Sequence, residues 1–162
     1  MSEHRVTMTI NGRVHDAQVE ARLSLADHLR QGAGYTGVHL GCEHGACGAC
    51  TVIVDGKAVR SCLILAVQAD GADIRTLEGL AAPDGSLHPV QRALRDEHGL
   101  QCGFCTPGVA MTLAALVEGD AKPAANELET AISGHLCRCT GYQGIRRAAR
   151  RLAEEDAKEG SE

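Results

Sequence analysis

Hydrophobic and polar residues alternate over residues 6–10 and again over residues 17–21, which is the two-residue period of a β-strand. Asn11-Gly12 lies between these segments and is typical of a tight hairpin turn. The pattern therefore predicts an antiparallel hairpin near the start of the chain. Further strands are predicted over residues 51–54 and 73–77, with a second hairpin turn at Asp55-Gly56.

Helical spacing of hydrophobic residues takes over after residue 86, where they recur every three or four positions. Asn126 and Glu129 are placed to form a capping box for one of these helices. A shorter helix is expected earlier in the chain, where Ser24 precedes Asp27 in the same arrangement. The hydrophobic positions of the four later helices are Leu87, Val90 and Leu94; Val109, Leu113, Leu116 and Val117; Leu128 and Ile132; and Ile145, Ala149 and Leu152.

The two patterns together predict an α+β fold in two parts. Residues 1–80 are expected to form a small sheet with one helix, and residues 87–153 an antiparallel four-helix bundle. The segment AAPDGS at 81–86 contains proline and glycine, so we expect it to be a linker. Residues 154–162 form a charged tail that is expected to fray.

Composition and charge exclude several classes of protein. The net charge is −5, which argues against a nucleic-acid-binding surface. No hydrophobic stretch approaches the ~20 residues that a membrane span requires, and no segment is typical of a signal peptide. The chain is therefore expected to be cytoplasmic. A basic cluster at Arg146, Arg147, Arg150 and Arg151 has helical spacing and is interpreted as one solvated or subunit-facing helix side.

Eight cysteines in 162 residues are unusual for a cytosolic protein, where disulfides are disfavoured and metal or redox chemistry is the default interpretation. Three of them follow the spacing C-x4-C-x2-C, which is typical of plant-type [2Fe–2S] ferredoxins. Gly41, Gly45 and Gly48 allow this loop to curl around a cluster, because glycine tolerates positive φ and close approach. The first predicted cluster ligands are Cys42, Cys47, Cys50 and Cys62.

The remaining cysteines form two pairs, each just before a predicted helix. Thr106 and Thr140 are expected to cap these helices, with Pro107 as the first helical residue after Thr106. The partial positive charge of helix N-termini favours thiolates and an anionic cluster. The pairs are therefore predicted to hold a second cluster at one end of the bundle. Its expected ligands are Cys102, Cys105, Cys137 and Cys139.

Alternative metal and redox motifs fit the cysteine spacing less well. A structural zinc site usually has two C-x2-C pairs, and a thioredoxin-like C-x2-C motif or disulfides would leave most of the pattern unexplained. A Rieske site needs a later C-x2-H, and covalent haem needs C-x2-C-H; neither motif occurs. The eight histidines lack ligand spacing and are interpreted as surface or packing residues. His44 is the exception, since it lies in the first cysteine loop and is placed to hydrogen-bond or modulate it.

Four motifs resemble the small iron–sulfur subunit of the molybdenum hydroxylases, the family of xanthine dehydrogenase, aldehyde oxidoreductase and carbon monoxide dehydrogenase. The motifs are G-C-E-H-G-A-C-G-A-C-T-V from Gly41, S-C-L from Ser61, Q-C-G-F-C-T-P-G from Gln101 and C-R-C-T-G-Y from Cys137. The resemblance extends over about residues 4–152 and includes all eight cysteines.

This resemblance implies a ferredoxin-like β-grasp domain followed by a helical domain, each with one [2Fe–2S] cluster. It also implies a large molybdopterin-binding subunit near the second cluster and a medium FAD-binding subunit near the first, in a heterotrimer or a dimer of heterotrimers. By the same resemblance, Gln101 and Cys139 face the molybdopterin of the partner.

The expected function is electron transfer from molybdopterin to FAD, in steps of one electron, within a hydroxylase or dehydrogenase. The sequence has no G-x-G-x-x-G loop after a strand, no P-loop and no nucleophile–base constellation, so no catalytic residue is predicted on this chain. Two alternatives stay open at this point. One is a free-standing soluble two-cluster electron carrier, and the other is a zinc-stabilised interaction module.

Overall fold

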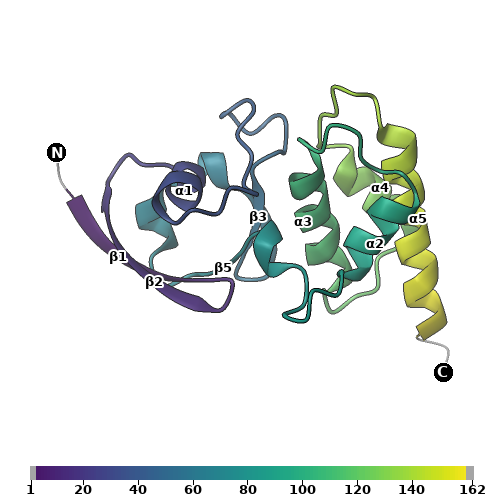
Figure 1. Cartoon of the computed structure of the whole chain (residues 1–162), viewed down its shortest axis with the longest axis horizontal. Coiled ribbons are helices and arrows are strands. Elements are labelled where there is room, and N and C mark those ends of the chain that lie inside the picture. The colour runs from purple at the N-terminus through teal and green to yellow at the C-terminus, as the bar shows by residue number, and fades with distance from the viewer. Residues whose placement is uncertain (1–2, 160–162) are drawn as a thin grey trace.

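The computed structural model describes residues 3–159, with side chains as far as residue 155. A sheet-containing half and a helical half lie side by side along the long axis of the molecule (Figure 1). Strand β1 (Glu3–Ile10) lies at one end of this axis and helix α5 (Tyr142–Glu159) at the other. The predicted α+β fold, a β-grasp part followed by a helical part, is confirmed.

The sheet has five strands in the order β2-β1-β5-β3-β4. The hairpins predicted at Asn11-Gly12 and Asp55-Gly56 are present, and all four of these residues have positive φ. The last strand along the chain, β5, lies in the middle of the sheet. It pairs parallel with β1 and antiparallel with β3. The other strands are β2 (Arg13–Glu20), β3 (Thr51–Val54), β4 (Lys57–Arg60) and β5 (Asp73–Arg75).

A short helix covers this sheet and completes the first core. Helix α1 (Leu25–Asp27) continues as one wider turn over His28–Gly32. Ser24 caps it as predicted, since its Oγ accepts from the backbone N–H of Asp27 at 3.0 Å. The core beneath it is aliphatic and contains Val6, Met8, Ile10, Leu25, Leu29 and Ile74.

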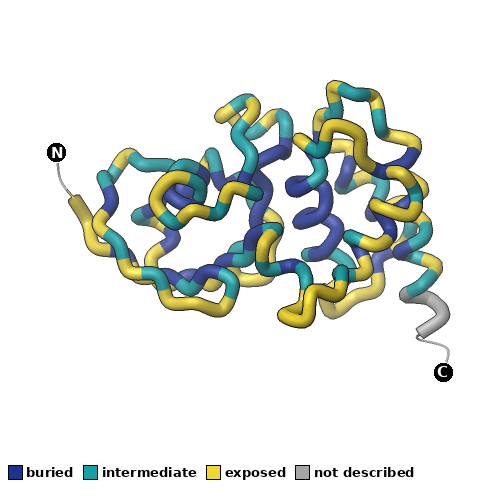
Figure 2. The backbone as a smooth tube through the Cα atoms, in the orientation of Figure 1, coloured by how far each residue is buried: buried dark blue, intermediate teal, exposed yellow. Residues whose placement is uncertain are grey.

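Four helices form the second half, as the hydrophobic spacing predicted. They are α2 (Pro89–Asp96), α3 (Thr106–Val117), α4 (Ala125–Ile132) and α5. Helix α3 lies between β3 and the other helices, and its residues from Pro107 to Ala114 are all buried (Figures 1 and 2). Ile53 of β3 belongs to the core of the helical half, so the two halves share a packed interface.

The start of α4 differs from the sequence-based expectation. The N-cap of α4 is Ala124, two residues before the predicted Asn126, and Glu127 rather than Glu129 accepts from the N–H of Ala124, at 2.7 Å. Glu129 instead pairs with arginines of α5. Helix α5 continues past Glu154 to Glu159, and residues 160–162 lie outside the described part of the chain, so the fraying of the tail stays a prediction. The segment 81–86 contains no helix or strand, but the domain boundaries drawn around it stay a prediction.

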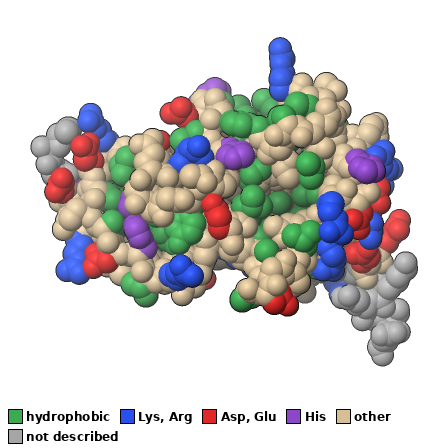
Figure 3. Space-filling view, in the orientation of Figure 1, with side chains coloured by type: hydrophobic (Ala, Val, Ile, Leu, Met, Phe, Trp, Pro, Cys, Tyr) green, Lys and Arg blue, Asp and Glu red, His purple; other side chains and the backbone are tan. Residues whose placement is uncertain are grey.

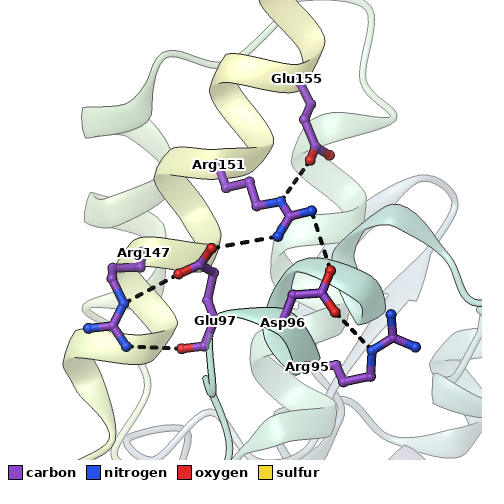
Figure 4. Close-up of polar contacts among 6 residues, drawn as sticks. All are labelled: Arg95, Asp96, Glu97, Arg147, Arg151 and Glu155. Atoms are coloured by element: carbon purple, nitrogen blue, oxygen red, sulfur yellow. Dashed lines mark hydrogen bonds and ion pairs between the residues drawn. The ribbon is translucent and has the colours of Figure 1, made fainter.

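The basic cluster of α5 is engaged within the molecule. Arg147 and Arg151 pair with Glu97 at the end of α2, and Arg151 also pairs with Asp96 (Figure 4). Arg151 has a further partner one turn along the helix in Glu155, at 2.8 Å. These arginines therefore tie α5 to α2 and do not form a free basic surface. Within residues 3–159, no helix has the length and apolar character needed to cross a bilayer.

Candidate iron–sulfur sites

The first cysteine loop has the tight curl that its glycines predicted. Gly45 and Gly48 have φ of 84° and 78°, and Glu43 also adopts a positive φ of 56°, which the sequence did not indicate. A Cβ on Gly41 would lie 3.2 Å from Cys47 Sγ, so glycine keeps space beside this sulfur. The fold brings Cys42 against Cys47, and Cys62 lies close to both Cys50 and Cys42, so the four cysteines form one group.

Backbone N–H groups of this loop point at sulfur. The amide of Cys47 lies 3.3 Å from Cys42 Sγ, and hydrogen bonds from the amides of His44 and Cys47 lower the pKa of the Cys42 thiol to about 6. The His44 ring hydrogen-bonds the loop itself, with Nδ1 2.5 Å from the Cys42 carbonyl oxygen. Such donors stabilise negative charge on sulfur, which is what a bound iron–sulfur cluster requires.

Cys62 joins this group from the turn that follows β4. Its thiol lies against Cys50, and burial together with that neighbour raises its pKa to about 11. Cys42 and Cys47 form the other close pair. A coordinating metal removes the thiol proton outright, so a raised pKa in the free thiol does not prevent ligation.

The second group lies at the N-terminal ends of α3 and α5. Cys105 itself occupies the N-cap of α3, and Thr106 is the first helical residue rather than the cap that the sequence indicated. Thr140 precedes the first residue of α5 by two positions and has a positive φ of 57°. The prediction that both cysteine pairs stand at helix starts is nevertheless confirmed.

Two close thiol pairs occur here as well. Cys105 lies against Cys137, and burial with that neighbour raises the pKa of Cys105 to about 12. Cys102 lies against Cys139, and the backbone N–H of Phe104 helps to lower the pKa of Cys102. The amide of Gly141 lies 3.3 Å from Cys137 Sγ.

This arrangement suits a two-iron cluster in each group. A [2Fe–2S] cluster has four cysteine ligands, two on each iron, and each group supplies four thiols in two pairs. The donors, their pairing and the inward N–H groups all fit iron–sulfur clusters.

The structure also places Gln101 beside the second group. A Cβ on Gly141 would lie 3.6 Å from both Gln101 Nε2 and Cys137 Sγ. Gln101 and Cys102 are exposed, and Cys139 is half-buried. The predicted contact of Gln101 and Cys139 with a pterin stays a prediction.

Nothing in the sequence indicated that the two cysteine loops contact each other. The N–H of Leu136 donates to the carbonyl oxygen of Cys47 at 3.0 Å. Nearer the surface, His39 Nδ1 lies 2.8 Å from the Phe104 carbonyl oxygen, and the two rings stack with centroids 4.9 Å apart. Contacts between residues so distant along the chain leave no local pattern.

Comparison with known proteins supports the presence of two iron–sulfur cluster domains in this chain. A "2Fe-2S iron-sulfur cluster binding domain" family matches residues 8–81, and a "[2Fe-2S] binding domain" family matches residues 76–150. The nicotine 6-hydroxylase small subunit of Paenarthrobacter nicotinovorans is 54% identical over 140 residues, which is 86% of this chain and 84% of that protein. The chain belongs to the [2Fe–2S] small subunits of the molybdenum hydroxylase family.

Further relatives of this small subunit agree in sequence and in fold. The caffeine dehydrogenase subunit gamma of Pseudomonas sp. (strain CBB1) is 52% identical, over 90% of this chain and 88% of that protein. A solved structure of quinoline 2-oxidoreductase from Pseudomonas putida 86 is 44% identical with a TM-score of 0.87, over 96% of this chain and 97% of that one. Aldehyde oxidoreductase from Desulfovibrio gigas matches with a TM-score of 0.86 and 40% identity, over 98% of this chain but 18% of that chain.

Proposed function

We propose that this small subunit relays electrons from molybdopterin in a large subunit to FAD in a medium subunit. The observation that carries the proposal is the pair of cysteine quartets, which lie in adjacent loops joined by the Leu136–Cys47 hydrogen bond. We assign Cys42, Cys47, Cys50 and Cys62 to one cluster and Cys102, Cys105, Cys137 and Cys139 to the other.

Each bound cluster would supply a centre that accepts and releases one electron at a time. The residues of this chain hold, insulate and orient those centres. Cys50 and Cys105 are buried and exclude water from one side of each site. The amides of Cys47 and Gly141 donate toward sulfur and stabilise its negative charge.

Exposed hydrophobic side chains gather near the cysteines and support a role within a complex. Among the described residues, every exposed large hydrophobic side chain except Val14 lies within three positions of a cysteine. Hydrophobic side chains are visible around the cysteine loops on one face of the molecule (Figure 3). Such patches are typical of protein interfaces. The residues concerned are Leu63, Leu65, Leu100, Phe104, Leu136 and Tyr142.

The side of the second quartet is the proposed docking side for the large subunit. A cavity of about 620 Å³ opens there between α3, α4 and α5. Cys105 and Cys137 line it, with Leu136 and Tyr142. A partner that covers this region would bring its pterin close to Gln101 and Cys139. The first quartet would then face the flavin subunit.

The relatives suggest which substrates to test. Their names include nicotine, caffeine and quinoline, all of which are N-heterocycles. We propose a substrate of this class for the complete enzyme, with its selectivity in the large subunit. The enzyme is proposed to act in the cytoplasm.

The test is to co-express the chain with the large and medium subunits encoded beside it and to add substrate without oxygen. Both clusters should be reduced, as seen by bleaching and by two paramagnetic signals, and an added dye should then be reduced. Flavin-free complex should still show substrate-dependent cluster reduction, whereas molybdopterin-free complex should not. Cluster reduction that requires the flavin would reverse the proposed direction. Failure to co-purify with these subunits would favour a free-standing carrier.

A further inference from the structure

The hydrogen bond between Leu136 and Cys47 joins the two cysteine groups through few covalent bonds. Cys47 belongs to the first quartet, and Leu136 directly precedes Cys137 of the second. The second link, from His39 to the Phe104 carbonyl oxygen, begins three residues before Cys42 and is therefore longer. If both quartets hold clusters as proposed above, the Leu136–Cys47 contact is the shorter connection between them.

A buried histidine stands directly beside this contact. His135 precedes Leu136 and is only 3% exposed. Its Nε2 lies 2.8 Å from the hydroxyl oxygen of Thr112 in the middle of α3. The other ring nitrogen, Nδ1, has no hydrogen-bond partner among the described residues and packs on Gly48, where a Cβ would lie 2.4 Å away. The ring therefore fills the space between α3 and the first cysteine loop.

Arg60 holds the same turn from the sheet side. Its Nη2 donates to the carbonyl oxygen of Gly134 at 2.9 Å, and its Nη1 donates to the hydroxyl of Thr51. The imidazole of His135 is held between two fixed elements, α3 and the first cysteine loop.

We propose that His135 is a positioning residue: anchored on Thr112 and packed on Gly48, it holds the N–H of Leu136 on the Cys47 carbonyl oxygen, where an electron crosses between the two clusters. Each crossing moves one electron, so the cluster that releases it is oxidised by one electron and the other is reduced by one. No bond is broken and no proton is exchanged. This inference rests on the proposed function and adds to it the residues that set the crossing point.

Thr112 offers the sharpest test, because it lies on α3 and is not adjacent to any cysteine. Thr112→Val removes the hydroxyl with little change of shape, and Thr112→Ser keeps it. The hydrogen bond from Leu136 to Cys47 is in equilibrium between a formed state and a broken one. We expect Thr112→Val to shift this equilibrium roughly fivefold toward the broken state, which is the effect of one lost buried hydrogen bond. Thr112→Ser should behave like the unsubstituted chain.

Three measurements on the full chain with both clusters bound read out this shift. Deuterium exchange should become faster in the peptide that contains Leu136. The magnetic splitting between the two reduced clusters should decrease, and the rate of electron transfer between them after flash reduction should fall. Iron content should not change. His135→Asn, which is too short to reach Thr112, should reproduce the effect.

Several results would overturn the proposal. Unchanged splitting and transfer rate in Thr112→Val with faster exchange would show that the contact does not carry the electron. Loss of a cluster in Thr112→Val but not in Thr112→Ser would make the pair a cluster-retention element instead. An effect of His39→Asn without one of Thr112→Val would assign the crossing to the Phe104 link. Missing clusters in the unsubstituted chain would instead refute the proposed function, so the two failures are distinguishable.

Discussion

Cys105 has two structural roles at once. It is buried, and it occupies the N-cap of α3, where its thiol lies against Cys137. Cys102, three residues earlier, is exposed. The second quartet therefore has one edge inside the protein and one at its surface, which suits the proposed exchange of electrons with another subunit.

Replacing Cys105 should separate the two sites experimentally. We expect Cys105→Ser to lose the second cluster and keep the first, because none of the four cysteines of the first quartet lies on or next to α3. Iron content should fall by half, and one of the two paramagnetic signals of the reduced protein should disappear. Leu100→Ala, a nearby substitution outside the quartet, serves as the control. Loss of both signals would mean that the two sites depend on each other for assembly.

His28 makes the sheet half sensitive to acid. It is buried under α1, its Nε2 has no hydrogen-bond partner among the described residues, and the His15 ring lies 5.1 Å away. Burial, with a smaller effect of His15, lowers the pKa of His28 below its ordinary 6.5. The unfolded chain therefore binds a proton at a higher pH than the folded one.

Stability should be fully retained above about pH 6.5. It should fall as the pH drops below about 6.5, because the unfolded state then binds more protons than the folded state. His28→Leu removes this titration, so the pH dependence of the urea midpoint between about pH 7.5 and about pH 5.5 should become flatter. His4→Gln, on the exposed start of β1, is the control and should keep the original slope. Parallel curves for His28→Leu and the unsubstituted chain would contradict a titrating role of His28.

At the level of elements, α3 is the most buried helix and the one that joins the two cores. It packs on β3 and on all the other helices of its half. Its hydrophobic residues do not lie on one stripe, because nearly every side of the helix contacts protein. The sequence predicted this helix from its spacing but not its central position.

Leu113→Ala should be strongly destabilising, since Leu113 is fully buried and its neighbours come from several elements. A Leu→Ala change of this kind costs about 2–5 kcal/mol, and the spread reflects how far the cavity collapses. Chemical denaturation would measure the loss. Val14→Ala, at a residue that is 77% exposed, should change the free energy of unfolding by less than about 0.5 kcal/mol. Similar losses in both variants would contradict the packing described for α3.

The sequence predicted the elements well where the signal is local. Strand alternation, the two hairpin turns and the Ser24 cap depend on neighbours in the chain, and the structure contains them. The capping box at Asn126 failed for the opposite reason: Glu129 has stronger partners in Arg146 and Arg150, which lie on another helix. Likewise, His135 had no ligand spacing, and only the folded chain brings Thr112 and Gly48 against it.

On the scale of the whole molecule, the exposed large hydrophobic residues other than Val14 lie close in sequence to cysteines of both groups. Leu63 follows Cys62 and packs over Gly45 of the first loop, yet is 62% exposed. Leu100 precedes the second group by two residues. Under the proposed function, these two side chains lie on the surfaces that face different partner subunits.

Charge at either position should therefore weaken one interface selectively. We expect Leu100→Glu to reduce binding to the molybdopterin subunit by roughly tenfold or more, and Leu63→Glu to do the same for the flavin subunit, as a buried interface residue would. Pairwise binding of purified subunits measures both effects. Val14→Glu, on the exposed hairpin, is the matched control and should bind normally. Equal weakening of both interfaces by either variant would contradict two separate docking sides.

Gly108 determines how closely the two halves can approach. A Cβ on this residue would lie 2.1 Å from the carbonyl oxygen of Gly48, so at this point α3 contacts the cysteine loop through main-chain atoms. Main-chain contacts do not change when hydrophobic side chains elsewhere are exchanged for others of similar size. Substitutions among the aliphatic core residues should therefore leave the distance between the two redox centres almost constant. Any side chain at position 108 would instead push the two centres apart.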